Sequence, residues 1–177
     1  KAYDFFFLRM FVLLLVLVFS CETGETAKDI SSENQLKFKE NTERIKSMLA
    51  AMSAEESDKF SQYFADSLKW SGPDKILIDD YETKEVLMAA LDGYIDMYDN
   101  HELRDIKFFG GSTYSSEETS DNPNDIRVYG NWHHTHAETG KAVSHKWMAL
   151  MRFNSDGQIY LFNDFFDVTG FLSQHLN

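Results

Sequence analysis

The sequence predicts an α+β fold, in which helices come first and a long, strongly bent antiparallel sheet then wraps around them. Apolar residues recur near a 3.6-residue spacing over residues 36–97, which is the period of an amphipathic helix. Three strand-like segments follow at residues 126–138, 141–153 and 158–167, separated by turn signals. Helices followed by a run of strands are typical of an α+β domain, and a sheet bent around helices leaves a cone-shaped cavity.

The first 20 residues are typical of a signal peptide. Lys1 and Arg9 flank an apolar run that ends at Phe19, too short to span a bilayer, which takes about 20 apolar residues. Ser20 then supplies a small residue, and Cys21, the single cysteine, follows it. This arrangement resembles the lipobox of bacterial lipoproteins, in which the cysteine is lipidated. The resemblance implies residues 1–20 as signal peptide and a lipid-anchored protein of the cell envelope, on its periplasmic or cell-surface side. The alternative is a buried N-terminal helix that carries a chance cysteine.

The formal net charge of −12 limits the partners of the chain. An acidic protein without a basic cluster is repelled by phosphate backbones and by anionic lipid headgroups. We therefore expect no nucleic-acid partner, and membrane contact only through Cys21. Lipidation of Cys21 would leave no thiol for a disulfide or a nucleophile. The sequence also lacks a glycine-rich phosphate loop, and we expect no cofactor.

Residues 21–35 are predicted to be an acidic tether, and the domain itself is predicted to span residues 36–177. The tether is polar and lacks aromatic residues, so it buries too little apolar surface to offset the entropy of ordering. A helix is expected from Leu36 onward. Its apolar stripe consists of Leu36, Ile45, Met48, Leu49 and Met52.

Two shorter helices and a strand are predicted next. Ser53 and Glu56 have the spacing of a capping box and would open a second helix that reaches Phe64. Residues 67–70 are typical of a short strand that ends before a Gly-Pro pair. Thr83 or Asp80 would cap a third helix. The apolar stripe of this helix consists of Val86, Leu87, Ala90, Leu91, Tyr94 and Met97.

The remaining elements form the sheet. Residues 103–115 are predicted to be a first long strand with a bend at Gly110-Gly111, and residues 119–124 a polar loop. A two-residue turn at Thr139-Gly140 fixes the register of the next two strands. This register opposes Trp132 to Trp147, His134 to His145 and His136 to Val143, all on one face of the sheet. Residues 168–175 are predicted to form a terminal helix.

Asp164 is the strongest candidate for chemistry. If the loop at residues 154–157 has an even number of residues, the alternation of side chains places Asp164 on the same face as His145 and Trp147. A carboxylate among aromatic walls is desolvated, its pKa rises, and it can act as a general acid or base. A three-residue loop with a glycine bulge would instead turn Asp167 inward, together with Ile159 and Leu161. A further alternative is a strand-end aspartate that binds a backbone amide.

The order of elements, the segment FADSLKW before a Gly-Pro pair, the turn NSDGQI and the ending NDFFD resemble the NTF2-like superfamily. Within it the chain is most similar to SnoaL-like domains, over residues 53–172. The resemblance implies an NTF2-like cone. The superfamily includes polyketide cyclases, ketosteroid isomerases, dehydratases, limonene epoxide hydrolases and binding proteins, so the fold does not decide the function. Asp164 matches the pocket aspartate of the epoxide hydrolases, but their arginine and second aspartate would fall near Trp132 and His134 and are missing.

The primary functional hypothesis is a pocket that binds a small, partly apolar molecule. The residues expected to line it are Trp70, Tyr94, Trp132, His134, His145, Trp147 and Asp164. Their aromatic members could also be ordinary core. The alternative is an enzyme of the isomerase, cyclase or dehydratase type, with Asp164 or His134 as the base and the second histidine, His145, as the acid. Asp164 would orient one of the two histidines.

Two further hypotheses concern a metal and a dimer. The residues His134, His136 and His145 have the spacing of a three-histidine zinc site, but NTF2-like domains seldom bind metals there, so we expect no metal. The outer face of the sheet would instead support a homodimer that acts as an interaction module without a ligand. The residues of this face are Tyr129, Asn131, His133, Met148 and Leu150.

Overall fold

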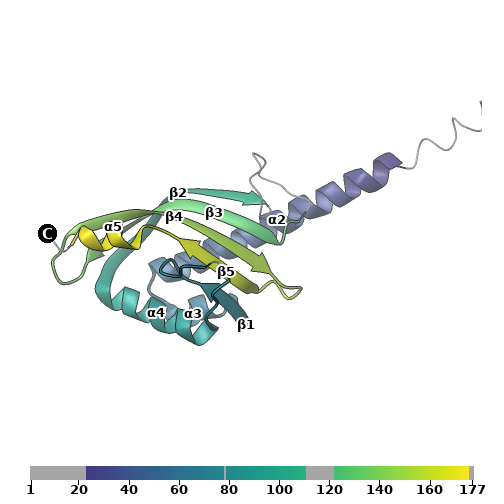
Figure 1. Ribbon diagram of the computed structural model, residues 1–177. Helices are drawn as coiled ribbons and strands as arrows, with labels where there is room; N and C mark the ends of the chain where they lie inside the picture. Colours follow the sequence, from purple (N-terminus) through teal and green to yellow (C-terminus); the bar gives the residue numbers. More distant parts are fainter. Residues whose placement is uncertain (1–22, 78, 111–121, 176–177) are drawn as a thin grey trace, which may run out of the picture.

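The computed structural model describes residues 23–77, 79–110 and 122–175 (Figure 1). The signal-peptide and Cys21 predictions therefore lie outside the described residues. The helices are α2 (Thr23–Ser53), α3 (Ser57–Ser61), α4 (Lys84–Met97) and α5 (Val168–Ser173). The strands are β1 (Phe64–Ser71), β2 (Tyr98–Gly110), β3 (Asp125–His136), β4 (Ala142–Phe153) and β5 (Ile159–Phe165).

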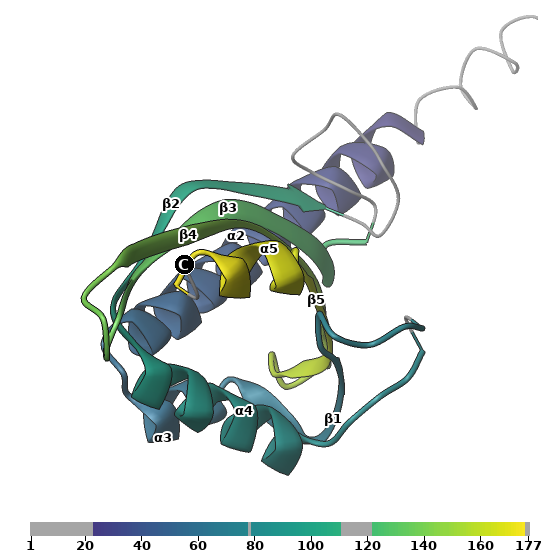
Figure 2. The ribbon, with the colours of Figure 1, turned by 60° about the vertical axis from the view of Figure 1, so that its left-hand side comes forward.

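The five strands form one curved sheet in the order β1-β5-β4-β3-β2. The strand β1 runs parallel to β5, and all other neighbours are antiparallel. Figure 2 shows the sheet arching over the interior, with α3 and α4 on the opposite side and α2 running along the length of the cone. The predicted α+β cone with a strongly bent sheet is confirmed.

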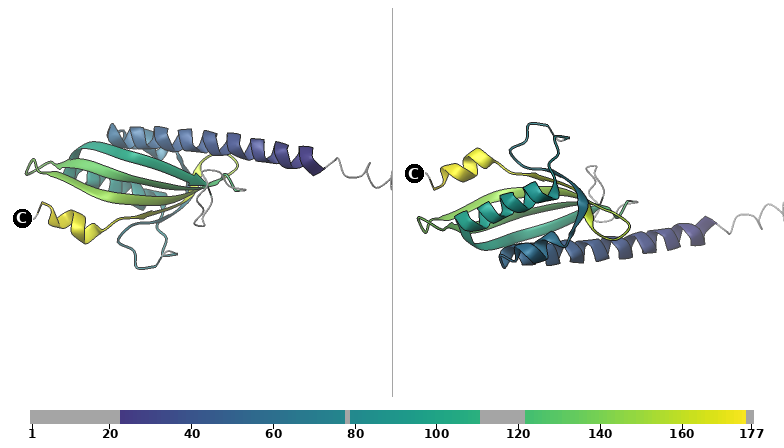
Figure 3. Two further views of the ribbon diagram at one scale, coloured as in Figure 1. Left: turned by 90° about the horizontal axis from the view of Figure 1, so that it is seen from above. Right: turned by 90° about the horizontal axis from the view of Figure 1, so that it is seen from below.

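The helix α2 begins at Thr23, well before the predicted start at Leu36. Its first part extends past the end of the sheet (Figure 3), and Leu36 is still 64% exposed. The segment predicted to be an acidic tether is thus helical from Thr23 onward, and its role as a tether stays a prediction. Once the packed part of a helix has formed, each added residue costs little, so a polar segment can extend it without burial. Among the described helices, none has the combination of length and apolarity needed to cross a membrane.

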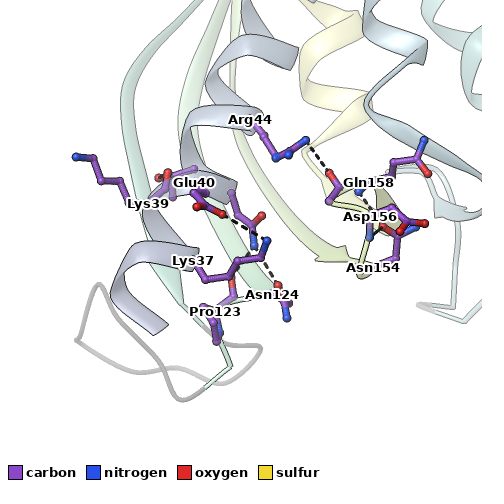
Figure 4. A network of polar contacts seen from close by, with 12 residues as sticks. Lys37, Lys39, Glu40, Arg44, Pro123, Asn124, Asn154, Asp156 and Gln158 are labelled. Atoms are coloured by element: carbon purple, nitrogen blue, oxygen red, sulfur yellow. Dashed lines mark hydrogen bonds and ion pairs between the residues drawn. The ribbon is translucent and has the colours of Figure 1, made fainter. Parts of the chain in front are cut away.

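Buried and exposed polar contacts fix α2 to the rest of the domain (Figure 4). The Asn41 side chain is fully buried, and its Nδ2 donates to the Pro123 carbonyl at 3.1 Å and to Asn124 Oδ1 at 3.2 Å. One turn later, Arg44 Nη1 donates to the Gly157 carbonyl at 3.4 Å. The helix is thereby bound both to the segment before β3 and to the β4–β5 turn.

The predicted capping box is wrong. Ser53 is the last residue of α2 rather than the cap of the next helix. The chain reverses at Glu55, which has a φ of 58°, and Glu56 is the N-cap of the short helix α3 without a side-chain capping bond. The serine-to-glutamate spacing is real, but the preceding helix continues through its first position.

The other elements are of the predicted type but differ in length from the prediction. The strand β1 contains the predicted residues 67–70, Thr83 is the N-cap of α4, and α5 starts where predicted. The strand β2 follows α4 directly at Tyr98, and it ends at Gly110, where a bend was expected. Of the predicted strand at 103–115 and loop at 119–124, residues 111–121 lie outside the described residues.

The β3–β4 connection is longer than predicted, and it shifts the register by two residues. His136 N donates to the Lys141 carbonyl at 2.8 Å, so four residues form the turn, with Gly140 at a φ of 68°. Thr139 N donates to His136 Nδ1 at 3.3 Å and supports this wider turn. The resulting cross-strand pairs are Trp132 with His145 and His134 with Val143, in place of the predicted Trp132–Trp147, His134–His145 and His136–Val143. Because side chains alternate with a period of two, the predicted residues keep the same face.

We expect Asn41→Ala to lower the free energy of unfolding by about 1–3 kcal/mol, because it leaves the buried Pro123 carbonyl without its donor. The control is Glu40→Ala, which removes only the exposed ion pair with Lys37 and should have little effect. Urea denaturation of both variants measures the difference. Equal losses in the two variants would contradict the role assigned to Asn41.

Candidate functional site

The interior of the cone holds a pocket of about 560 Å³ with mainly apolar walls. Pockets of roughly 300–1,000 Å³ are typical for small-molecule ligands. Six of the seven residues predicted to line a pocket do so: Trp70, Tyr94, Trp132, His145, Trp147 and Asp164. The stripe predicted for α4 forms one wall, which explains why its members Val86 and Met97 stay partly exposed.

All three tryptophans of the chain face this pocket. Trp132 on β3 and Trp147 on β4 make an edge-to-face contact, with ring centroids 6.1 Å apart. Trp70 lines the pocket from β1, at the edge of the sheet and separated from β4 by β5. Its backbone forms a bridge with Glu82, at 3.0 Å and 2.7 Å, and Glu82 pairs with Lys75 at 2.6 Å. The segment after β1 therefore fixes Trp70 and places an ion pair at the rim of the pocket.

Asp164 lies on the inner face of β5, opposite Ala149 on β4. Its Oδ1 accepts a hydrogen bond from Trp70 Nε1 at 3.2 Å, and the Trp147 indole donates to the same carboxyl group. The parity that places Asp164 inward is thus confirmed. The alternative with Asp167 inward is wrong, because Asp167 caps α5 and accepts from the Gly170 backbone N–H at 2.8 Å.

The environment of Asp164 changes its acidity. Burial raises the pKa of the carboxyl group to about 7, although the indole donors of Trp70 and Trp147 oppose this by stabilising the carboxylate. Near neutral pH the group can therefore donate or accept a proton. This is the property required of a general acid or base.

His134 does not line the pocket but lies behind its wall, only 3% exposed. Its Nε2 is 2.8 Å from Tyr94 Oη, and its Nδ1 is 2.9 Å from His101 Nδ1. Tyr94 Oη also contacts His145 Nε2 at 3.3 Å and so bridges the two histidines. Instead of opposing each other across the strands, the His134 and His145 rings stack diagonally at 5.6 Å.

His101 was missed by the sequence analysis. It lies on β2, in the part of that strand that precedes the predicted start at residue 103. The residues before it, Asp99 and Asn100, are typical of a turn rather than of a strand, so His101 was not expected on the sheet. Its inward direction follows only once the strand is known to begin at Tyr98.

Burial keeps this cluster uncharged. It lowers the pKa of His134 to about 3, with the neighbouring His101 and His145 adding to the effect. Burial also lowers the pKa of His145 and raises the pKa of the Tyr94 hydroxyl. In the described part of the chain, no hydrogen bond joins Asp164 to His134 or His145, so the expected Asp–His couple is not formed.

The three-histidine zinc hypothesis finds no support in this geometry. His136 turns toward the β3–β4 connection and stacks on His175, with centroids 4.2 Å apart. Both ring nitrogens of His134 are already engaged by Tyr94 and His101. Within the residues that the structure describes, no three His, Cys, Asp or Glu side chains are grouped so as to hold a metal ion.

Comparison with known proteins identifies the fold. No family model and no curated protein matches the chain. Among solved structures, it is similar to a candidate polyketide cyclase from Xanthomonas campestris pv. campestris, at a TM-score of 0.60 and 16% identity, over 78% of this chain and 98% of that one. An NTF2-like protein from Burkholderia xenovorans gives a TM-score of 0.56 and 14% identity, over 77% and 95%.

A third similar structure is a protein with a ketosteroid isomerase-like fold from Catenulispora acidiphila, in complex with trimethylamine. It gives a TM-score of 0.52 and 13% identity, over 75% of this chain and 91% of that one. At such identities the likeness establishes the fold alone. The chain therefore has the NTF2-like cone, which matches the expectation from its sequence.

Asp164→Asn should reduce the dependence of stability on pH. The folded-state pKa of about 7 lies above the value of about 3.9 expected in the unfolded chain. Below about pH 4 both states hold the proton, and the group contributes no difference. As the pH rises toward 7 the unfolded state ionises first, so the wild-type protein loses stability, by on the order of 2–4 kcal/mol at about 1.4 kcal/mol per pKa unit.

Urea denaturation between pH 4 and pH 8 measures this effect. The asparagine variant should be more stable than the wild type at pH 8, and the two should converge at pH 4. Asp96→Asn, a change at an exposed carboxyl group on α4, is the matched control and should leave the pH profile unchanged. Parallel profiles for wild type and Asp164→Asn would show that Asp164 is not desolvated.

Proposed function

We propose that this protein binds a small, partly apolar molecule in the cone. The observation that carries the proposal is the 560 Å³ pocket, whose apolar walls include all three tryptophans and whose polar groups include Tyr94, His145 and Asp164. Aromatic rings supply a large apolar contact area, and a few polar groups are enough to orient a ligand.

The chemistry of the polar groups limits the ligand class. Asp164 in its neutral form donates a hydrogen bond, and the Tyr94 hydroxyl is neutral and adaptable. Neither group presents a fixed positive charge, and the positive charge of Lys75 in the lining is paired with Glu82, so the pocket does not favour an anionic ligand. A molecule with an apolar body and one carbonyl or hydroxyl oxygen fits these walls best.

A second candidate function is catalysis in the same pocket. It is favoured by the pKa of about 7 for Asp164, which suits a carboxyl group that removes a proton next to a carbonyl and returns it elsewhere. Such a step belongs to isomerase, cyclase or dehydratase chemistry, and one similar structure is a candidate polyketide cyclase. In this hypothesis Asp164 is the acid–base group. His145 lies at the pocket wall, and His134 acts only through its contact with Tyr94.

We also propose that the protein is anchored in the bacterial cell envelope through a lipid on Cys21, with residues 1–20 removed. This rests on the sequence alone. A homodimer through the outer face of the sheet remains a prediction, and Tyr129, Met148 and Leu150 are half-buried there.

Ligand binding can be followed without a label, because every tryptophan lines the pocket. Camphor and 2-decanone, two apolar molecules with a single carbonyl, are expected to change the intrinsic fluorescence in a saturable way. Gly93→Phe should abolish this change, since Gly93 lines the pocket and a Cβ there meets open space.

The control is Ala89→Phe, a change of similar size at an exposed position on the same helix and away from the lining. It should bind as the wild type does, and both variants should keep the wild-type circular dichroism. Saturable binding that persists in Gly93→Phe would place the ligand outside the pocket. No saturable change with either probe would contradict the proposed ligand class.

The anchor is tested by expressing the full chain in a bacterium that is fed radiolabelled palmitate. The protein should incorporate the label and sediment with membranes, and Cys21→Ser should lose both properties. Ser20→Ala, which keeps a small residue before the cysteine, is the control and should retain them. An unlabelled wild-type protein would overturn the lipoprotein prediction.

A further inference from the structure

A continuous line of side chains leads from the pocket wall to the protein surface. Tyr94 at the wall contacts His134 at 2.8 Å, and His134 contacts His101 at 2.9 Å. The His101 side chain is completely buried, and its Nε2 is 3.9 Å from Glu55 Oε1. The Glu55 side chain is 42% exposed and lies just after the end of α2. One end of the line thus meets the pocket and the other meets solvent.

The direction of each hydrogen bond along this line follows from the protonation of His145. His145 Nδ1 lies 3.2 Å from the Lys146 carbonyl, which can only accept, so this nitrogen carries a proton. A neutral His145 then has a lone pair on Nε2, which accepts from the Tyr94 hydroxyl. The Tyr94 oxygen is left to accept from His134 Nε2–H, its other partner.

A neutral imidazole has one donor and one acceptor nitrogen, and this also assigns the protons of His134 and His101. With its proton on Nε2, neutral His134 presents a lone pair on Nδ1, and His101 Nδ1–H donates to it. His101 must then have a lone pair on Nε2, which points toward Glu55. This nitrogen is buried and has no hydrogen-bond partner in the structure. A buried acceptor without a hydrogen bond lowers the stability of the fold. Its position beside the exposed carboxyl group of Glu55 therefore indicates a functional role.

We propose that Glu55, His101, His134 and Tyr94 form a proton relay that carries protons from solvent to the pocket wall. Glu55 takes up a proton from solvent and, once its side chain closes the 3.9 Å gap to hydrogen-bond distance, gives it to His101 Nε2. His101 Nδ1–H passes to His134 Nδ1, and His134 Nε2–H passes to the Tyr94 oxygen. The original Tyr94 hydroxyl proton passes to His145 Nε2, its acceptor, and His145 releases a proton into the pocket that it lines. One proton enters and one leaves, His101 and His134 end neutral with their protons on the opposite nitrogens, and His145 returns to its neutral form.

Glu55 exchanges its proton with water, because its side chain is 42% exposed. After one transfer His101 Nε2 carries a proton, so the protons must move back along the line, or both rings must turn over, before Glu55 can supply another. The charged groups that face His101 are Glu55 and Asp99, both acidic, and neither blocks entry of a proton. The Tyr94 ring stacks on His101 at 5.6 Å and helps to seal the line from water. A relay needs this seal, because water along the line would exchange each proton locally.

The relay extends the proposed function, because a ligand oxygen in the pocket would receive the proton, and this role depends on a ligand binding there. The relay itself is a property of the empty protein. It is therefore tested without any ligand, so failure of the relay and failure of ligand binding are separate results.

The first measurement is the proton position on each ring, by nitrogen-15 NMR of the histidines at pH 7. We expect protons on His145 Nδ1, His134 Nε2 and His101 Nδ1. A proton on His101 Nε2, or on His145 Nε2, would reverse the chain and overturn the inbound direction.

The second measurement is the exchange of the His101 Nδ1 proton with water in Glu55→Gln. The glutamine amide does not take up or release a proton near neutral pH, so exchange should slow by at least about tenfold. This lies within the rate effects of positioned acid–base groups. Glu56→Gln, at the neighbouring exposed position, is the matched control and should stay within about twofold, since it removes no group from the relay. Equal exchange in wild type and Glu55→Gln would show that protons enter elsewhere, and it would overturn the proposal.

Discussion

Desolvation on the inner face of the sheet determines the properties of the whole site. The residues that face the interior of the cone have little access to water, so each polar group must find its partner inside. Asp164 finds two indole N–H donors, and Tyr94 joins His134 to His145. The same burial that fixes these contacts also holds the histidines neutral and keeps Asp164 close to its midpoint at neutral pH. Position and acidity therefore have one physical origin.

The strands show what periodicity can and cannot predict. Alternation along β3, β4 and β5 placed the aromatic residues and Asp164 on the correct face, although the turn after His136 shifted the register by two residues. An even shift keeps the face and changes only the neighbours. That is why the prediction of the pocket face was correct and the predicted pairing of His134 with His145 was wrong. His101 was missed because nothing in the local sequence marks the start of β2 at Tyr98. Ser53 was wrongly predicted to cap a helix, because its spacing to Glu56 does not show that the preceding helix continues through Ser53.

Similar structures share the cone with this chain at only 12–16% identity. A shape can persist at this level because a bent sheet and its covering helices need only apolar residues of suitable volume. The polar groups inside are not constrained in that way. The combination of Trp70, Asp164 and the tyrosine–histidine line is consequently the feature by which the ligand should be sought, rather than the name of any structural neighbour.

The long helix α2 also determines where the cone is held. From Thr23 to Asn41, the first buried residue among those from Ser32 onward, the helix advances by about 27 Å at 1.5 Å per residue. If a lipid on Cys21 holds the chain at a bilayer, this arm is a stiff spacer rather than a flexible leash. A spacer of set length keeps the pocket at a constant height above the headgroups and restricts the directions in which it can face. The protein would then sample a thin layer of the aqueous space beside the membrane, and its ligand would have to be present in that layer.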